Sequence, residues 1–526
     1  MTRPLIIAID SGTSVVKAVA FDTSGVQVAA AARPNTYVLL AGGGAEQDMT
    51  RSWTDVCAVL HELTTDLALR LPDSKIEMLA VTAQGDGSWL VDSDGQPVGQ
   101  GWLWLDARGA AIVESLTASG AAQAAFAYTG TGLAACQQVA QLLWREANVP
   151  GQLAAAAASL HPKDFLYLRL TGQAATSPDE GTFTFGDFRT RGYRDEVLEA
   201  LGIERFRRLL PPIVDGTTTS HPLTARAAEA TGLQKGLPVV LGYVDVVCTT
   251  LGAGIYGCGT EAGVTIVGST GMHIRLVSDT AHVVPSPAMT GYCMAFPVPG
   301  HTLQAQSNMA STLNIDWIAD IAVEAAAMAS GGYVSRSTVL KALDSGVGEA
   351  RPGSVVYHPF ISTAGERGPF TDAYARAGLF GLDQNVRLMD LARGIYEGLC
   401  FAARDCYLAI GGAPAEIRVT GGAARSHPLR AILAAVLNRP LRASAHEEAG
   451  AAGVAMIAAV QQGVFPDMAA CAAAWVAPRP AATVEPDAAL VLLYERLFPI
   501  YRDAYHAMPA LWRRFQAAHQ TELPDA

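Results

Sequence analysis

Asp10 ends an apolar run and opens a short polar turn, a combination that suits metal and phosphate chemistry. The run 5–9 is typical of a buried strand, and the turn 11–14 follows it directly. A carboxylate at a strand end, beside a turn with free backbone N–H groups, suits a metal ion that bridges phosphates. The hydroxyls of Thr13 and Ser14 add donors. A β-hairpin with an ordinary polar turn is the alternative interpretation of this stretch.

Asp245 is the second aspartate with a position that favours chemistry. It follows a short strand at 239–242 and precedes the apolar stretch 246–251, which begins like a helix. A carboxylate held there, at the mouth of a cleft, can take a proton from an attacking hydroxyl. Aspartate is also a common helix N-cap, so a purely structural role stays open at this point.

The strand–turn–strand pattern of residues 5–21 occurs a second time, far along the chain. Residues 262–267 form an apolar strand, 268–271 (GSTG) form a small hydroxyl-rich turn, and 272–277 return as a strand. Two such units can hold a triphosphate from opposite sides of a cleft. The Walker A pattern is absent, which excludes a P-loop enzyme.

A glycine-rich turn at 421–426 follows the strand 418–420 and precedes a helix that begins near Pro428. Glycines at a strand end let a flat base and its ribose approach the backbone, with the helix N-terminus nearby. An ordinary β–α connection is the alternative.

Polar residues flanked by glycine and tryptophan indicate a site for a polyhydroxyl compound. Gln84, Asp86 and Asp106 can exchange hydrogen bonds with hydroxyls, and Trp104 lies close to them in sequence. Polar turns with core tryptophans are the alternative. The polar and aromatic stretch 176–191 lacks clear periodicity and predicts a substrate-facing loop, or else a capped surface loop.

Length and composition limit the kinds of protein that could carry these sites. A chain of 526 residues is too long for one core, so we expect two large domains. The net charge of −12 gives no basic surface for nucleic acid. The eight cysteines are scattered without a CxxC pair, which favours reduced thiols. No signal peptide or membrane span is recognisable, so the sequence predicts a soluble cytoplasmic protein.

Taken in order, these motifs resemble the FGGY family of carbohydrate kinases over nearly the whole chain. The resemblance implies an α/β protein with two duplicated actin-like, ribonuclease H-like ATPase domains and a central cleft. Its domains would be 1–246 (substrate and phosphate side), 247–480 (nucleotide side) and a helical capping segment, 481–526. The motifs that carry the resemblance are Asp10-x-Gly-Thr13-Ser-x-x-Lys17, Trp104-x-Asp106-x-Arg108, Asp245, Gly268-Ser-Thr-Gly271, 377–397 and Gly421-Gly-Ala-Ala-Arg-Ser426.

Carried over by this resemblance, each motif takes a role in phosphoryl transfer from ATP. Asp245 would be the general base, and Asp10 and Asp245 would hold Mg²⁺. The residues implied to bind ATP are Thr13, Ser14, Lys17, Gly268, Ser269, Thr270, Gly421, Gly422, Ala423 and Ser426. Those implied to bind the acceptor are Gln84, Asp86, Trp104, Asp106, Arg108 and Asp245.

The acceptor is predicted from the segments that differ among FGGY kinases. Glycerol kinases of the family carry Arg-Glu where this chain has Gly85-Asp86, and xylulokinases carry Met-His. The segments AQGDGSWLVD, GWLWLDARG, TFTFGDFRTRGY, NMASTLNIDWI and YHPFISTAGERGPF are similar to those of bacterial erythritol kinases. The resemblance thus implies phosphorylation of a terminal hydroxyl of erythritol, giving erythritol 4-phosphate.

Other functions stay open from the sequence. One is a kinase for another small polyol or ketose: xylulose, ribulose, glycerol or ribitol. A second is an actin-like or chaperone-like ATPase that acts on a protein partner, and a third is a sensor that has lost turnover. For the kinase we expect a small polyol or sugar as partner, no nucleic acid, no membrane and a possible homodimer.

Overall fold

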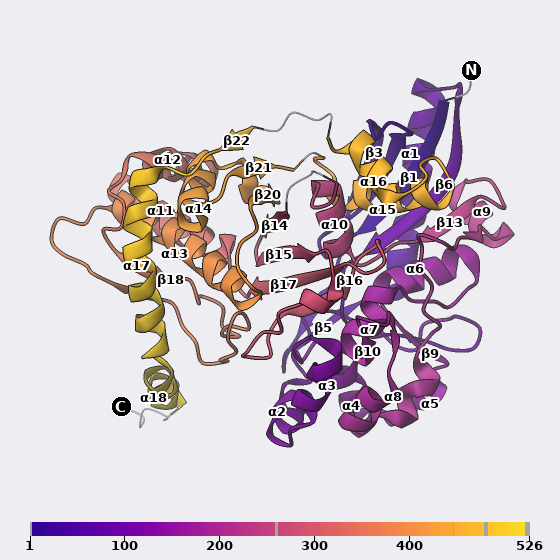
Figure 1. The fold of residues 1–526 in the computed structure, drawn as a ribbon, viewed down its shortest axis with the longest axis horizontal. Helices are drawn as coiled ribbons and strands as arrows, with labels where there is room; N and C mark the ends of the chain where they lie inside the picture. Colours follow the sequence, from indigo (N-terminus) through magenta and orange to yellow (C-terminus); the bar gives the residue numbers. More distant parts are fainter. Residues whose placement is uncertain (1–2, 258–260, 445, 478–481, 521–526) are drawn as a thin grey trace.

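Two lobes, each with a mixed β-sheet and helices on its faces, make up the protein (Figure 1). The computed structural model describes residues 3–257, 261–444, 446–477 and 482–520. The N-terminal end of the described chain lies on the first lobe, and the C-terminal helices lie at the far side of the second (Figure 1). This arrangement confirms the predicted α/β class.

The first lobe is organised around β1, whose apolar residues are buried on both sides. Leu5, Ile7 and Ile9 belong to one hydrophobic core, while Ile6 and Ala8 point into another. Such continuous burial is expected for a strand in a sheet covered on both faces. The six strands, in sheet order, are β12 (His221–Pro222), β13 (Pro238–Leu241), β6 (Ser74–Ala83), β1 (Arg3–Ser11), β2 (Val15–Asp22) and β3 (Gln27–Pro34).

The second lobe repeats the central part of this topology. In the first lobe, β1 pairs antiparallel with β2 and parallel with β6. In the second, β14 pairs antiparallel with β15 and parallel with β20. The duplication inferred from the two turns is therefore present in the strand pairing. The seven strands, in sheet order, are β16 (Tyr292–Ala295), β17 (Thr302–Asn308), β15 (Gly271–Val277), β14 (Ala262–Val267), β20 (Glu416–Thr420), β21 (Leu441–Ala443) and β22 (Thr483–Val484).

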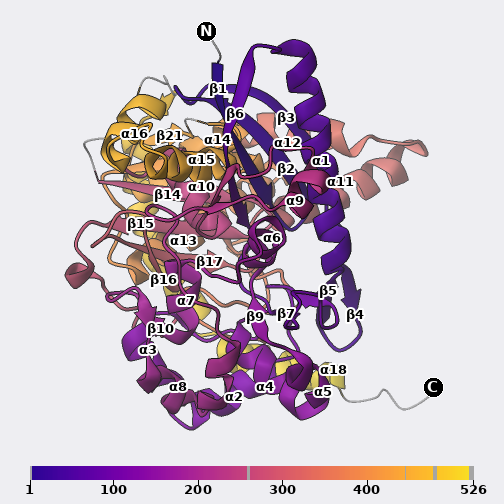
Figure 2. The same cartoon turned by 90° about the vertical axis from the view of Figure 1, so that its right-hand side faces the viewer.

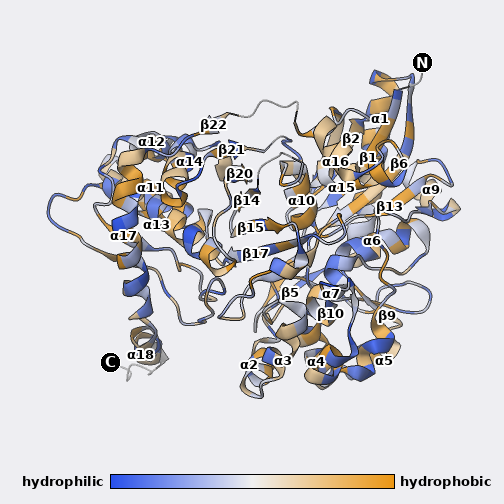
Figure 3. Cartoon of the chain, viewed as in Figure 1, coloured by the Kyte–Doolittle hydropathy of each residue, from blue (hydrophilic) through white to orange (hydrophobic). Residues whose placement is uncertain are grey.

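Two helices, α10 (Asp245–Ala253) and α15 (Ala449–Gln461), pack against each other where the lobes meet. α15 also packs on β1 and β6, so a late segment of the chain covers the first sheet. Figure 2 shows α1 (Met49–Arg70) and α15 on opposite sides of β1. Both α10 and α15 are strongly hydrophobic (Figure 3), as helices buried on several sides should be.

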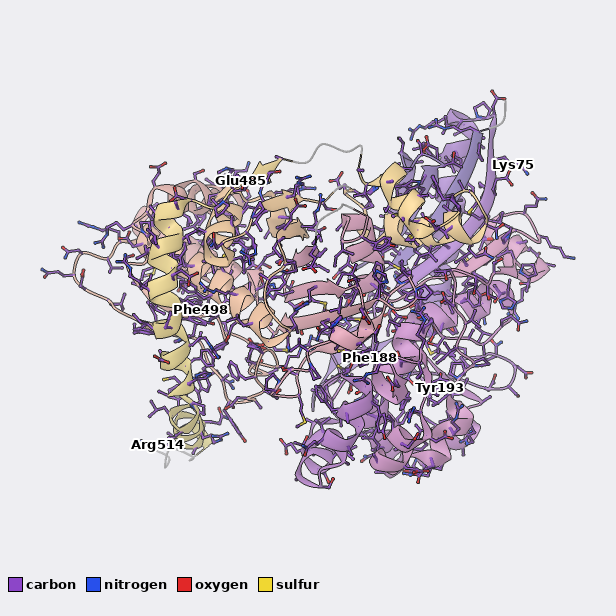
Figure 4. The ribbon with its side chains drawn as sticks, viewed as in Figure 1. Lys75, Phe188, Tyr193, Glu485, Phe498 and Arg514 are labelled. Carbon is purple, nitrogen blue, oxygen red and sulfur yellow. The ribbon has the colours of Figure 1, made fainter. Side chains whose placement is uncertain are left out.

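The remaining helices surround the two sheets, and several of them form the ends of the lobes. In Figure 1, α2 to α5 and α8 gather at the lower end of the first lobe, and α17 runs along the outer edge of the second. Phe498 on α17 belongs to the core of that lobe (Figure 4). These helices are α2 (Ala110–Ala118), α3 (Ala121–Thr129), α4 (Gln138–Asn148), α5 (Pro150–Ala155), α6 (Pro162–Thr171), α7 (Pro178–Phe185), α8 (Asp195–Leu201), α9 (Ala225–Thr231), α11 (Thr312–Ser330), α12 (Arg336–Glu349), α13 (Leu388–Ala409), α14 (His427–Leu437), α16 (Met468–Trp475), α17 (Ala488–His506) and α18 (Pro509–Gln520).

Short strands and 3₁₀ turns complete the chain. They are β4 (Val38–Leu40), β5 (Gly44–Gln47), β7 (Trp89–Val91), β8 (Gly101–Trp102), β9 (Ala158–Leu160), β10 (Gly186–Asp187), β11 (Gly192–Tyr193), β18 (Val356–His358), β19 (Gly378–Phe380), η1 (Glu204–Leu209), η2 (Thr280–His282) and η3 (Gly422–Arg425). Within the described ranges, none of the helices combines the length and the apolar character that crossing a bilayer requires.

The structure of residues 176–191 differs from the loop predicted from the sequence. In place of a substrate-facing loop it contains α7, whose eight residues are all buried. Ser177 precedes the helix, Pro178 opens it, and Asp179 and Glu180 fill its first turn. These are the residues that favour a helix N-terminus, and the short length of the helix conceals its periodicity. One residue of α7, Phe183, does reach the site described next.

Candidate active site

A cavity of about 180 Å³ lies between the lobes, at the N-terminus of α10. Its walls come from the turn after β1, the ends of β6 and β14, and the strands β15 and β16. Its residues from the first lobe and α10 are Thr13, Gln84, Gly85, Asp86, Trp104, Phe183, Val244, Asp245 and Val246, and those from the second lobe are Thr270, Met272, Tyr292, Met294 and Arg367. Six residues predicted from the sequence thus share one cavity: Thr13, Gln84, Asp86, Trp104, Asp245 and Thr270.

A chain of hydrogen bonds fixes one wall of the cavity. The indole N–H of Trp104 donates to Oγ1 of Thr13 over 2.8 Å, and Thr13 donates in turn to Oε1 of Gln84 over 2.8 Å. Nε2 of Gln84 donates to Oε1 of Gln47 over 3.0 Å. The amide of Gln84 therefore uses both its oxygen and its nitrogen on protein partners. Its direct role is to orient Thr13 and, through Thr13, Trp104, rather than to offer hydrogen-bonding groups to a ligand.

Asp86 lines the cavity and keeps one carboxylate oxygen without a partner among the described residues. It has a positive φ of 54° in the turn after β6, a conformation that Asp tolerates better than most residues. Its Oδ2 accepts a hydrogen bond of 2.9 Å from the hydroxyl of Tyr292 in the second lobe. Its Oδ1 is buried and has no partner among the described residues. Burial raises the pKa of Asp86, although the hydrogen bond from Tyr292 opposes that shift.

Asp245 is the first residue of α10 and lies in a strongly acidic environment. Its Oδ1 accepts from the backbone N–H of Val246 over 2.7 Å. Burial and then the charge of Asp10 raise the pKa of Asp245 well above its usual range. The turn before the helix is fixed as well, since the N–H of Val244 donates to Oδ2 of Asp179 over 2.8 Å.

Asp10 lies against α15. A Cβ on Gly450 would be only 2.5 Å from Oδ2 of Asp10, so the helix backbone approaches this carboxylate directly. Burial raises the pKa of Asp10 to about 6, and the nearby Lys17 lowers it in part. Lys17 itself is paired with Glu448 over 2.5 Å.

The turn after β14 is fixed from behind by the start of α11. The N–H groups of Ser311 and Thr312 donate to the carbonyls of Ser269 and Gly268 over 2.7 and 3.0 Å. Thr270 faces the cavity, while Ser269 is exposed. Of the residues of this turn, Thr270 therefore lines the same cavity as Thr13.

The chain matches known proteins along most of its length. Residues 5–252 match the model for the FGGY family of carbohydrate kinases, N-terminal domain, and residues 263–462 match that for the C-terminal domain. The chain belongs to the FGGY family of carbohydrate kinases. Membership makes it a carbohydrate kinase with a small carbohydrate substrate and ATP as donor, and it argues against an ATPase that acts on a protein partner.

Individual relatives agree with this assignment. The chain is 49% identical to the erythritol kinase of Brucella abortus over 510 residues, which cover 97% of each chain. It is 26% identical to the L-xylulose/3-keto-L-gulonate kinase of Escherichia coli, covering 97% of this chain and 98% of that one. Family membership confirms the resemblance on which the sequence analysis relied.

Solved structures confirm the predicted actin-like, ribonuclease H-like fold of this FGGY kinase. The gluconate kinase of Lactobacillus acidophilus superimposes with a TM-score of 0.86 at 22% identity, covering 98% of this chain and 100% of that one. The glycerol kinase of Plasmodium falciparum, solved with ADP, gives a TM-score of 0.82 at 16% identity, covering 96% and 98%.

Asp106 and Arg108 of the kinase lie outside the cavity around Asp245. Arg108 pairs with Oδ2 of Asp106 over 2.6 Å and with Oε1 of Glu46 over 2.8 Å. Asp106 also accepts from the N–H of Ala45 over 2.8 Å. The guanidinium of Arg108 lies 3.4 Å over the ring of Trp102. Both side chains are therefore occupied with protein partners that join β5, β8 and the segment after β8.

Several residues predicted to bind ATP also lie beside the cavity rather than on its wall. A Cβ on Gly421 would be 2.5 Å from the carbonyl oxygen of Val267, which places this turn next to the turn at Gly268. Ser426 is the N-cap of α14 and accepts from the N–H of Leu429 over 3.2 Å. Gly422 is exposed and Ala423 partly exposed, whereas Ser14 is exposed beside Thr13.

Sequence reasoning used second-lobe segments to predict the acceptor but named no individual acceptor-side residue in that lobe. Tyr292 and Arg367 line the cavity, as do Met272 and Met294. A lone tyrosine in a strand gives no signal of a site. Arg367 lies in the segment AGERGP, where Glu366 and Arg367 stand between two glycines. Charged residues in such a position are a usable signal of a functional loop.

Proposed function

We propose that this kinase transfers the γ-phosphoryl group of ATP to a terminal hydroxyl of a small polyol, namely erythritol, and so forms erythritol 4-phosphate. The observation that carries the proposal is the small cavity in which Asp245 lies opposite hydroxyl-binding groups such as Asp86. Its volume of about 180 Å³ is below that of pockets for drug-sized ligands and suits a short acyclic acceptor. The 49% identity to an erythritol kinase supports the choice of polyol.

The chemistry of the donor set fits a Mg²⁺ ion at Asp10 and Asp245. The charge of Asp10 raises the pKa of Asp245, and a divalent cation bound by both carboxylates would relieve that repulsion. Oxygen ligands of this kind suit Mg²⁺, which would neutralise charge on the phosphates when bound. The turns at Thr13 and Thr270 would hold the phosphates, with Gly421, Gly422, Ala423 and Ser426 on the nucleoside side.

The residues of the kinase would act mainly by position and charge. Asp245 would accept the proton of the acceptor hydroxyl as that oxygen attacks phosphorus, and the adenosine diphosphate leaves with the bond electrons. Asp86 would accept a hydrogen bond from another hydroxyl, while Trp104 covers the carbon chain. Walls from both lobes would exclude water, which would otherwise compete as acceptor.

A coupled assay of ADP formation across a polyol panel tests the proposal. We expect erythritol to give the highest kcat/KM among erythritol, glycerol, ribitol, xylulose and ribulose, and ADP release without acceptor to be slow. Preference for another member of the panel would move the assignment to that acceptor. Turnover that no polyol changes would refute the proposed kinase activity in favour of an ATPase. No turnover at all would refute it in favour of the sensor alternative.

We expect an unusually high acidic limb in the pH profile of kcat/KM. Asp10 and Asp245 must be ionised to act, and the pKa of Asp10 is about 6 rather than the ordinary 3.8. Activity should therefore be lost as the pH falls to about 6, or already at a higher pH where Asp245 takes up its proton first. Because Mg²⁺ competes with protons for Asp10, a higher Mg²⁺ concentration should move the limb to lower pH. A limb near pH 4 that ignores Mg²⁺ would contradict this prediction.

A further inference from the structure

Arg367 is held rigidly at the edge of the second lobe. Its backbone N–H donates to Oε1 of Glu366 over 2.9 Å, and the same oxygen accepts from the N–H of Met309 over 2.8 Å. The carbonyl of Gly368 accepts from Nδ2 of Asn308 over 2.9 Å. These contacts fasten the segment to the end of β17, so the side chain of Arg367 leaves from a fixed point.

The guanidinium of Arg367 reaches the cavity with most of its donors unused. Its Nε donates to Oγ of Ser307 over 3.2 Å, and its central carbon lies 5.6 Å from the ring of Trp104. Within the described part of the chain, its two terminal nitrogens make no hydrogen bond or ion pair. Arg367 also lines a second cavity of about 310 Å³ that adjoins the first across Trp104 and Tyr292. The unused donors therefore face open space.

Asp86 supplies the complementary acceptor on the same cavity. Its Oδ1 is the buried oxygen without a partner among the described residues, and its Oδ2 is oriented by Tyr292. Asp86 and Arg367 both line this cavity, and among the described residues they form no ion pair with each other. A hydroxyl both donates and accepts, so a vicinal diol satisfies a carboxylate and a guanidinium at once.

We propose that Arg367 determines acceptor specificity, because with Asp86 it binds the internal hydroxyls of the polyol from the opposite lobe. This inference rests on the proposed polyol kinase activity. It implies that both lobes recognise the polyol together. Arg367 of the second lobe supplies the hydrogen-bond donors, and Asp86 of the first lobe supplies the hydrogen-bond acceptor. A compound that lacks internal hydroxyls would leave both charged groups unsatisfied.

The test compares Arg367→Met with the wild type on two ligands. Erythritol carries the internal hydroxyls, and butane-1,4-diol keeps the terminal hydroxyls without them. Calorimetry gives the dissociation constant of each ligand, and a coupled assay gives kcat/KM for erythritol. We expect the variant to bind erythritol about 10–100-fold more weakly, the effect of losing charge-assisted hydrogen bonds. Its affinity for the diol should change less than about threefold, and the KM for ATP should stay the same.

Two further variants make the result interpretable. Arg376→Met removes an arginine of the same segment that donates to the carbonyls of Ala373 and Ala375 but itself lines neither cavity, and should behave as wild type. Arg367→Lys keeps the charge and should recover part of the affinity for erythritol. Equal weakening of both ligands, or of neither, would overturn the role of Arg367. A wild type that phosphorylates no polyol would instead refute the proposed function itself.

Discussion

Asp245→Asn is expected to lower kcat/KM for the polyol by about 10²–10⁴-fold, the range for loss of a general base. Asparagine has nearly the same shape and can still accept the hydrogen bond from Val246, but it cannot take the proton of the acceptor hydroxyl. The turns at Thr13 and Thr270 are unchanged in this variant. Its affinity for ADP in the absence of Mg²⁺ should therefore stay within a few-fold of wild type, which calorimetry would measure alongside the coupled assay.

The same substitution should not destabilise the fold, which separates a catalytic loss from a structural one. The pKa of Asp245 is raised in the folded state by burial and by Asp10. Its ionised form therefore opposes folding above its ordinary pKa, and the penalty shrinks as the pH falls toward that value. Asp245→Asn removes this penalty, so its thermal midpoint at neutral pH should equal or exceed that of wild type.

Asp467→Asn is the matched control. Asp467 caps α16, where its Oδ1 accepts from the N–H of Ala470 over 2.8 Å, and asparagine caps a helix about as well. This variant also exchanges Asp for Asn at a helix N-terminus, but far from the cavity, and should keep full activity. Near-wild-type turnover by Asp245→Asn would remove Asp245 as the base.

The candidate residues predicted from the sequence alone stand at the ends of regular elements. Asp10, Thr13 and Thr270 follow strands with unmistakable apolar runs, and Asp245 lies between a strand and a helix. A strand end beside a small polar turn is a local pattern, so one sequence suffices to find it. The resemblance to FGGY kinases then supplied the order and the duplicated fold.

Residues whose importance depends on distant contacts could not be found in this way. Tyr292 reaches Asp86 across 206 positions of sequence, and no local pattern reports such a pairing. Arg108 shows the opposite case. It is a charged residue near a predicted site, but its guanidinium is already paired with Asp106 and Glu46. Polarity and proximity in sequence do not reveal whether a side chain still has free hydrogen-bonding groups.

Gly453→Ala is expected to destabilise the kinase by about 1–3 kcal/mol, the cost of overpacking a tight contact. A Cβ at this position would lie 1.8 Å from the carbonyl oxygen of Cys248, so α15 and α10 must move apart. α10 begins with Asp245, and α15 lies against Asp10 through Gly450. Misplacement by about 1 Å can cost roughly 10²-fold in rate, and we expect a loss of that size in kcat/KM.

The control for Gly453→Ala is Gly348→Ala in α12, where an added Cβ meets nothing within 4 Å. Replacing a helical glycine without a clash usually stabilises a protein by about 0.4–1 kcal/mol, so the two variants should shift the unfolding midpoint in opposite directions. Denaturant unfolding, ADP binding and the coupled assay measure the three effects. If Gly453→Ala kept both the stability and the activity of wild type, the close contact of α10 with α15 would not be what holds the two carboxylates together.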